Sequence, residues 1–351
     1  MGLMDIPQSK WGSGTGRQVI LKSDFLKIEA AVAESFEIAH SPSLEYVDGA
    51  KIRVNATADS KARAILCGFP SPLHRGLWVD GDLCDGRLRE NAAAVTLDFA
   101  QSGALWGTEK VSQWYAIYAL AGNAEAIFSL KAMPVMRVSS QSSQIITLRN
   151  NFNTADIGYG FFVDELAGAK LLMLTGASRG LMRAVTANNG DSGTGGTLTY
   201  GGTALTLSPG DWFVVLPDTN FRYLGMVLNN SDGSLEAFYQ EGGSFFYRTP
   251  RLAASGAING YTLTDLGVVV PPTARRLEGF AAATSGSDVK LAISYDGANP
   301  ALVVHASQPS GNFQGTRGAI PFAGLVPEGH RLYLNNENSA NQLVKITAWE
   351  E

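Results

Sequence analysis

The stretch LEYVDGAKIRVNAT, residues 44–57, indicates the fold class of this chain. Apolar and polar residues alternate on both sides of Asp48-Gly49, and a period of two residues is that of a half-buried strand. An Asp-Gly pair between two such runs predicts a hairpin with a type I′ turn, because both residues tolerate the positive φ angles that this turn needs. The stretch therefore predicts antiparallel β-structure.

Short alternating or apolar runs continue to the end of the chain, separated by turns such as Ser208–Asp211. One of them, Gln113–Leu120, is apolar on both alternating faces, which predicts a central strand covered on two sides with its aromatic rings in a core. The predicted strands after the first hairpin are Arg63–Gly68, Ala94–Phe99, Gln113–Leu120, Ala126–Leu130, Lys170–Thr175, Met182–Thr186, Thr197–Tyr200, Trp212–Leu216, Tyr223–Leu228, Phe245–Arg248, Val268–Val270, Arg276–Ala281, Val289–Tyr295, Ala301–Ala306, Arg331–Leu334 and Leu343–Trp349.

The organisation along the chain is read from changes in composition. Residues 1–17 are polar and glycine-rich, as in a flexible arm. Ser23–Phe36 predicts a short helix with Ser23 as its cap, although part of this run also alternates as a strand would. Composition changes again at Met136–Gln144, which indicates a boundary near residue 145. We predict a mainly β fold of two or three consecutive antiparallel β-sandwich or jelly-roll-like modules: an arm with a short helix over residues 1–40, β-modules over 41–145 and 146–249, and a C-terminal β-sandwich over 250–351.

Charge and hydropathy exclude several classes of partner. The formal net charge of −5 leaves no excess of Lys and Arg to neutralise phosphates, so we expect no nucleic-acid binding. No run of about 18 apolar residues occurs and the first residues do not resemble a signal peptide, so we expect no membrane span. Only 17% of residues are charged, against about 25% in ordinary soluble domains, which favours surfaces covered by other subunits.

Gly176–Gly180 is a literal G-x-S-x-G with Ser178 at its centre, the pattern of a hydrolase nucleophile elbow. His305 and His330 follow it in the chain. However, too few residues separate Ser178 from Asn188-Asn189-Gly190 for the helix that an elbow requires. We therefore predict a glycine-rich turn, with no catalytic residue, and keep a serine hydrolase of cell-surface polymer as a remote alternative.

Metal and cofactor chemistry has one candidate, the loop that carries Asp80, Asp82 and Asp85. Carboxylate oxygens suit Ca²⁺, but the spacing departs from the EF-hand order, so solvated turn aspartates are the favoured interpretation. The four histidines have no metal-binding spacing, and the glycines of Gly190–Gly196 lack the lysine of a phosphate loop. We predict no cofactor.

The two cysteines, Cys67 and Cys84, are too few for a disulfide scaffold. Cys67 follows the apolar run Ala64–Leu66, which is typical of a buried reduced thiol. A Cys67–Cys84 bridge stays open as an alternative.

Several short segments of the chain carry a resemblance to a known class of protein. The segments LWGTEK, QWYA and KAMPVMR, at residues 105–110, 113–116 and 131–137, resemble segments of virion proteins of tailed bacteriophages. The segments VVVPPTARR, VPEG, LYL and VKITAW, at residues 268–276, 326–329, 332–334 and 344–349, resemble β-sandwich modules that end many phage appendage proteins. The resemblance implies a structural subunit of a tail, baseplate, collar or capsid appendage, commonly a trimer, and brings no catalytic residue with it.

The resulting prediction is a non-enzymatic virion structural and assembly protein, assembled in the host cytoplasm, with itself and other virion proteins as partners. The alternative is a carbohydrate- or host-receptor-binding protein at an appendage tip. That alternative is motivated by Phe221 and Tyr223, which the sequence suggests are aromatic residues exposed at a turn.

Overall fold

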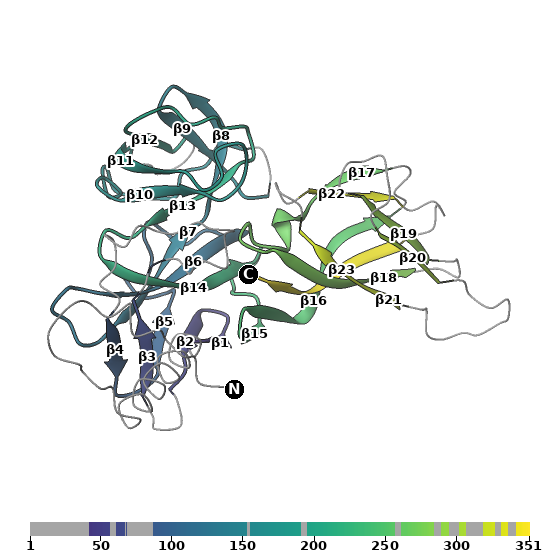
Figure 1. Cartoon of the computed structure of the whole chain (residues 1–351), viewed down its shortest axis with the longest axis horizontal. Helices are drawn as coiled ribbons and strands as arrows, with labels where there is room; N and C mark the ends of the chain where they lie inside the picture. The colour runs from purple at the N-terminus through teal and green to yellow at the C-terminus, as the bar shows by residue number, and fades with distance from the viewer. Residues whose placement is uncertain are drawn as a thin grey trace, which may run out of the picture. The chain divides into compact units, whose positions relative to one another are not determined.

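The structure is a computed structural model and describes residues 42–56, 61–66, 68, 87–152, 155–190, 195–256, 261–283, 289–294, 302–306, 319–326, 331–335 and 342–351. Two compact units, Met1–His40 and Ser41–Glu351, divide the chain, and all described residues belong to the second. This part is built from β-strands and one 3₁₀ turn, which confirms the predicted mainly β fold (Figure 1). It contains no helix long and apolar enough to cross a membrane. The predicted arm and the predicted helix Ser23–Phe36 lie outside the described residues.

A three-stranded antiparallel sheet, ordered β14-β6-β7, contains two strands that are buried along their whole length, and we call it the central sheet. Its strands are β6 (Gln113–Ala121), β7 (Ser129–Pro134) and β14 (Asn220–Asn229). Every residue of β6 and β14 is buried, so both faces of these strands are covered. The ring of Tyr118 packs edge-on against that of Phe221, with 5.5 Å between centroids. The predicted central strand and the core role of its aromatic rings are confirmed.

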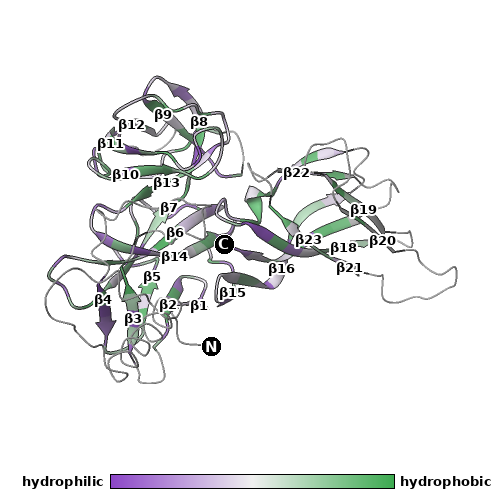
Figure 2. Cartoon of the chain, in the orientation of Figure 1, coloured by the Kyte–Doolittle hydropathy of each residue, from purple (hydrophilic) through white to green (hydrophobic). Residues whose placement is uncertain are grey.

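A closed six-stranded barrel follows β7 in the chain and precedes β14 (Figure 1). Its antiparallel strands have the order β10-β11-β12-β9-β8-β13, and β13 closes the barrel by pairing with both β8 and β10. β13 is buried throughout, and Figure 2 shows the hydrophobic colouring of β10 and β13. The six strands are β8 (Met136–Ser142), β9 (Ile145–Arg149), β10 (Lys170–Met173), β11 (Met182–Asn188), β12 (Thr197–Tyr200) and β13 (Trp212–Leu216).

The strand pairing places the module boundaries differently from the sequence prediction. Ile145, at the predicted boundary, pairs with Ser142 in the β8–β9 hairpin, inside the barrel. β14 follows the barrel in sequence but pairs with β6 along its whole length, so residues 146–249 are not one continuous module. The composition changes at Met136–Gln144 because the second half of β8 becomes partly exposed, as its burial pattern shows. This change of composition therefore marks a change of exposure within one strand rather than a boundary.

The first described strands form two small sheets. The predicted hairpin is present, with Asp48 opposite Lys51, but the predicted type I′ turn is wrong, because neither Asp48 nor Gly49 has a positive φ. Instead the Asp48 carboxylate accepts a hydrogen bond from the Ala50 N–H at 2.9 Å, which stabilises the turn without that conformation. The strands are β1 (Leu44–Asp48), β2 (Lys51–Val54) and β5 (Val95–Asp98) in one sheet, and β3 (Ala62–Ile65) and β4 (Leu88–Asn91) in the other.

Two further antiparallel sheets make up the C-terminal part. One contains β15 (Phe238–Glu241), β16 (Ser244–Gly256), β23 (Gln342–Glu350), β18 (Arg276–Ala283) and β21 (Ala319–Leu325), and the other contains β17 (Thr262–Asp265), β22 (Arg331–Asn335), β19 (Val289–Ser294) and β20 (Leu302–Ala306). The predicted strand Val268–Val270 is wrong. The chain forms the 3₁₀ turn η4 (Leu266–Val268), capped by Asp265. Leu266, Val269 and Val270 are buried there without strand pairing, and Val268 is half-buried.

Candidate functional site

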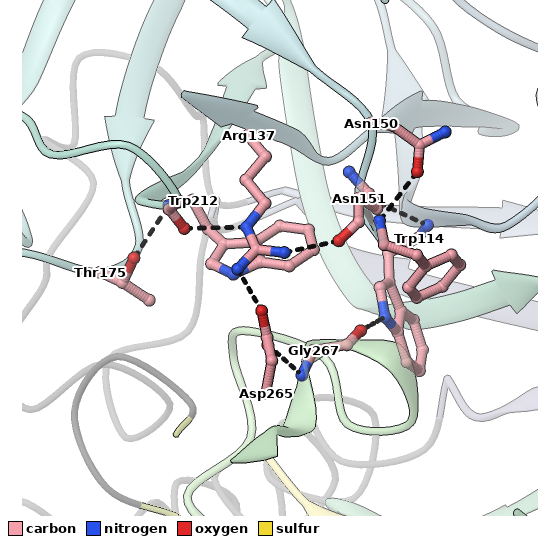
Figure 3. A network of polar contacts seen from close by, with 10 residues as sticks. Trp114, Arg137, Asn150, Asn151, Thr175, Trp212, Asp265 and Gly267 are labelled. Atoms are coloured by element: carbon pink, nitrogen blue, oxygen red, sulfur yellow. Dashed lines mark hydrogen bonds and ion pairs between the residues drawn. The ribbon is translucent and has the colours of Figure 1, made fainter. Parts of the chain in front are cut away.

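A buried polar network surrounds Arg137 near the start of β8 (Figure 3). Only 2% of its side chain is exposed. Nε donates to the Gly210 carbonyl at 3.0 Å, Nη1 donates to the Asn151 carbonyl at 2.6 Å, and Nη2 forms an ion pair with the Asp265 carboxylate. The guanidinium also lies over the Trp212 ring, 4.7 Å from its centroid. These partners compensate the charge for its removal from water.

The network continues from Asp265 into two other parts of the fold. The second carboxylate oxygen of Asp265 accepts the Gly267 N–H at 2.9 Å, and the Gly267 carbonyl accepts the indole N–H of Trp114 at 2.7 Å. Trp114 lies on β6 and packs edge-on against Trp349 of β23, with 5.8 Å between ring centroids. We call this network the junction, because it links the barrel, the central sheet and the turn η4.

Asn151 completes the junction and is fully buried. Its side-chain oxygen accepts the main-chain N–H of Trp114 at 3.1 Å, and its amide donates to the Val135 carbonyl at 3.0 Å and to the Tyr159 hydroxyl at 3.3 Å. Burial raises the pKa of Tyr159, so this phenol stays neutral. The polar groups of Arg137, Asn151 and Asp265 are thus engaged within the junction, whereas the buried indole N–H of Trp212 has no hydrogen-bond partner among the described residues. The arrangement is suited to holding parts of the chain together.

The structure places Ser178 in the turn between β10 and β11, where Gly176 and Gly180 have positive φ angles of 80° and 83°. The Ser178 side chain is buried; its hydroxyl donates to the Thr206 carbonyl at 3.0 Å and accepts the Thr206 N–H at 2.8 Å. A strand, β11, follows the turn where a nucleophile elbow requires a helix. Ser178 therefore links the β10–β11 turn to the loop between β12 and β13 through hydrogen bonds with Thr206.

Most of the other candidate residues suggested by sequence lie outside the part of the chain that the structure describes. Asp80, Asp82 and Asp85, both cysteines, and His40, His74 and His330 lie outside the described residues, and only the strand position of His305, on β20, is described. In the described ranges, no three His, Cys, Asp or Glu side chains gather closely enough to hold a metal ion.

The prediction that Phe221 and Tyr223 are exposed at a turn is wrong. They are 0% and 2% exposed, because β14 already begins at Asn220 and carries both rings into the core. β14 thus begins three residues before the predicted strand Tyr223–Leu228.

A loop at one end of the barrel presents two large apolar side chains to water. Phe162 is 80% exposed and Val163 is 70% exposed. We call residues 162–166 the apolar loop. Sequence reasoning missed it, although Phe161-Phe162-Val163 followed by two acidic residues is an apolar run without strand alternation.

Buried Asn188 of β11 holds the apolar loop in one conformation. Its amide donates to the Phe162 carbonyl at 2.8 Å, its side-chain oxygen accepts the Leu166 N–H at 2.8 Å, and its main-chain carbonyl accepts the Asp164 N–H at 2.9 Å. Within the loop, the Glu165 carboxylate accepts the Phe162 N–H at 2.9 Å. The exposed pair therefore projects from a well-supported backbone.

Comparisons with protein-family models, with curated proteins and with solved structures found no significant match for this chain.

Proposed function

We propose that the chain is a non-enzymatic structural and assembly subunit of a tailed-bacteriophage virion, located in a tail, baseplate, collar or capsid appendage. In this proposal it assembles in the host cytoplasm, associates with itself, as a trimer in the favoured form, and contacts other virion proteins. The observation that carries the proposal is the apolar loop, in which Phe162 and Val163 are 80% and 70% exposed. Large apolar side chains gathered on a surface mark protein contact sites.

The hydrogen bonds that hold the apolar loop favour a role in protein–protein contact. Four hydrogen bonds to Asn188 and Glu165 hold the backbone that carries Phe162 and Val163. A loop already held in its bound conformation loses little conformational entropy when a partner covers it. Aromatic residues are also enriched at the centres of protein interfaces. The low charge content of the chain fits extensive contacts of this kind.

A second candidate function is host-carbohydrate or receptor binding at an appendage tip. Phe221 and Tyr223 no longer support it, but Tyr239 of β15 does. This ring is 51% exposed and stacks on Phe246 of β16 with 4.6 Å between centroids and 5° between planes. The outer face of such a pair is a flat amphipathic surface on which a ligand ring can stack.

Particle incorporation tests the proposed function. Antibody labelling of purified particles in electron micrographs should place the chain on the virion, and a Phe162→Asp/Val163→Asp variant should fold normally but fail to join the particle or the purified oligomer. The matched control is Leu181→Asp, which alters another exposed apolar residue of the barrel, 45% exposed, and should assemble normally. Unlabelled particles together with a monodisperse wild-type monomer would exclude the proposal.

For the second candidate, the test is glycan-array binding of wild type and Tyr239→Ala. Glycan binding by wild type that is lost in Tyr239→Ala would support this candidate function. Wild-type protein that binds no glycan on the array would exclude it.

A further inference from the structure

The carboxyl group of Glu351 is buried between three segments of the chain. Its side chain is 3% exposed. One carboxyl oxygen accepts the Thr273 hydroxyl at 2.7 Å, and the other accepts the Tyr223 hydroxyl of β14 at 2.9 Å. The Glu351 N–H donates to the Gly243 carbonyl at 3.0 Å. The residue after β23 is thus fastened to the central sheet, to the segment before β18 and to the β15–β16 turn.

The groups that lie against this carboxyl group and donate toward it are uncharged: the hydroxyls of Thr273 and Tyr223, the main-chain N–H of Met226 and the indole of Trp349. The nearby Arg275 guanidinium donates to the main-chain oxygen of Glu351, at 2.6 Å. Arg276 pairs with Glu350 at 3.8 Å. On the side of the central sheet the titratable groups are the phenols of Tyr223 and Tyr118, whose rings lie 6.0 Å apart.

Both phenols remain neutral in acidic and neutral solution. Burial raises the pKa of Tyr118 and of Tyr223, and the Glu351 carboxylate raises that of Tyr223 further. Neither group can therefore supply a charge that compensates an ionised Glu351. A carboxylate placed in such surroundings is disfavoured relative to the neutral acid, because hydroxyl hydrogen bonds replace only part of its hydration.

We propose that Glu351 is a proton-operated latch: the neutral acid holds the end of β23 against β14 and the Thr273 segment, and loss of the proton lets this end open more readily. Opening returns the carboxylate to water, where its charge is fully hydrated. The latch changes the local equilibrium between closed and open states and does not require the rest of the fold to move.

The direction of the pH effect follows from the two states. Burial raises the pKa of Glu351 to about 7 in the closed state, from an ordinary value of 4.5, and hydrogen bonds from Thr273, Tyr223, the Met226 main chain and the Trp349 side chain oppose part of that rise. A raised carboxyl pKa means that the closed state holds the proton more tightly. The latch is therefore fully effective below about pH 4.5, weakens as pH rises toward 7, and changes little beyond that.

Hydrogen–deuterium exchange of the whole chain tests the latch without any substitution. Exchange rates are corrected for the intrinsic effect of pH, and peptides that cover Ala348–Glu351 are compared with peptides that cover β13 as an internal control. We expect the corrected opening of the latch segment to rise about tenfold per pH unit between pH 5 and 7 and to level off above that range. A corrected opening that is independent of pH would overturn the proposal.

A pair of neighbouring glutamates supplies matched variants. Glu351→Gln keeps the shape of the side chain but cannot ionise, so its latch segment should lose the pH dependence. Glu350→Gln removes the adjacent carboxylate, whose side chain is 40% exposed, and should keep the wild-type profile. A Glu351→Gln protein with the wild-type pH profile, or a Glu350→Gln protein without it, would contradict the assignment to Glu351.

Discussion

Arg137 in the junction and Glu351 at the end of β23 are both almost completely buried, at 2% and 3% exposure, yet their surroundings differ. Arg137 has a carboxylate, two carbonyls and an aromatic ring around it. Glu351 has two neutral hydroxyls at its carboxyl group. A guanidinium cannot give up its charge in a protein, so burial demands compensating partners, whereas a carboxyl group can become neutral by keeping a proton. Arg137 therefore keeps its charge at every pH at which the protein folds, whereas in our proposal the charge of Glu351 depends on pH.

Removing the charge of Arg137 should have the largest effect on the free energy of unfolding. Arg137→Met deprives the Gly210 and Asn151 carbonyls of their donor and Asp265 of its ion-pair partner. We expect the free energy of unfolding to fall by about 3–5 kcal/mol, because two carbonyls each lose a hydrogen bond from a charged donor, worth about 1.5–3 kcal/mol. The Asp265 carboxylate, 35% exposed, stays in contact with water and adds less. Urea denaturation followed by tryptophan fluorescence measures it. A loss below about 1 kcal/mol would show that the junction does not hold the three parts together.

Changing the pH should have the next largest effect, and it acts on Glu351. A folded-state pKa of about 7 against an ordinary 4.5 destabilises the fold by about 3 kcal/mol as pH rises from below 4.5 to above 7. Glu45 opposes this trend, because its hydrogen bond with Arg53 lowers its pKa. The measured quantity is therefore the difference in unfolding free energy between wild type and Glu351→Gln, at pH 5 and at pH 8. Equal differences at the two pH values would refute the prediction.

Removing a buried but uncharged group provides an intermediate case. Ser178→Ala eliminates both hydrogen bonds with Thr206. We expect a loss of about 1–2 kcal/mol that is independent of pH, because two neutral hydrogen bonds are lost and no charge is involved. Urea denaturation at two pH values measures this loss. The control is Ser231→Ala, an exposed turn serine, which should change stability by less than about 0.5 kcal/mol.

Breaking an exposed ion pair should have the smallest effect. Arg53 and Glu45 lie 2.6 Å apart, but their side chains are 41% and 37% exposed. Arg53→Met should cost less than about 1 kcal/mol, and the loss should shrink further in high salt. Thermal melts at two ionic strengths check this. A cost equal to that of Arg137→Met would mean that burial does not explain the contrast with the junction.

Local patterns predicted individual elements well and their assembly poorly. Alternation predicted the β1–β2 hairpin, and the apolar faces of Gln113–Leu120 predicted the central strand. Neither pattern carries information about the partner of a strand, so the pairing of β14 with β6 across the whole barrel was not foreseen. The candidate sites show the same limit. Arg137 appeared in the sequence as one basic residue in a polar stretch, and Phe162 as one more aromatic residue.

By itself the sequence determined the fold class, because side-chain alternation and turn residues act over a few neighbouring positions. The tertiary structure alone decided which charged side chains become buried and which partners they meet. Arg137 meets Asp265 and Glu351 meets Tyr223, in each case a residue 128 positions away in the chain. Burial and partner chemistry, which set the energy of a charged group, depend on such distant contacts and are not encoded in any local pattern.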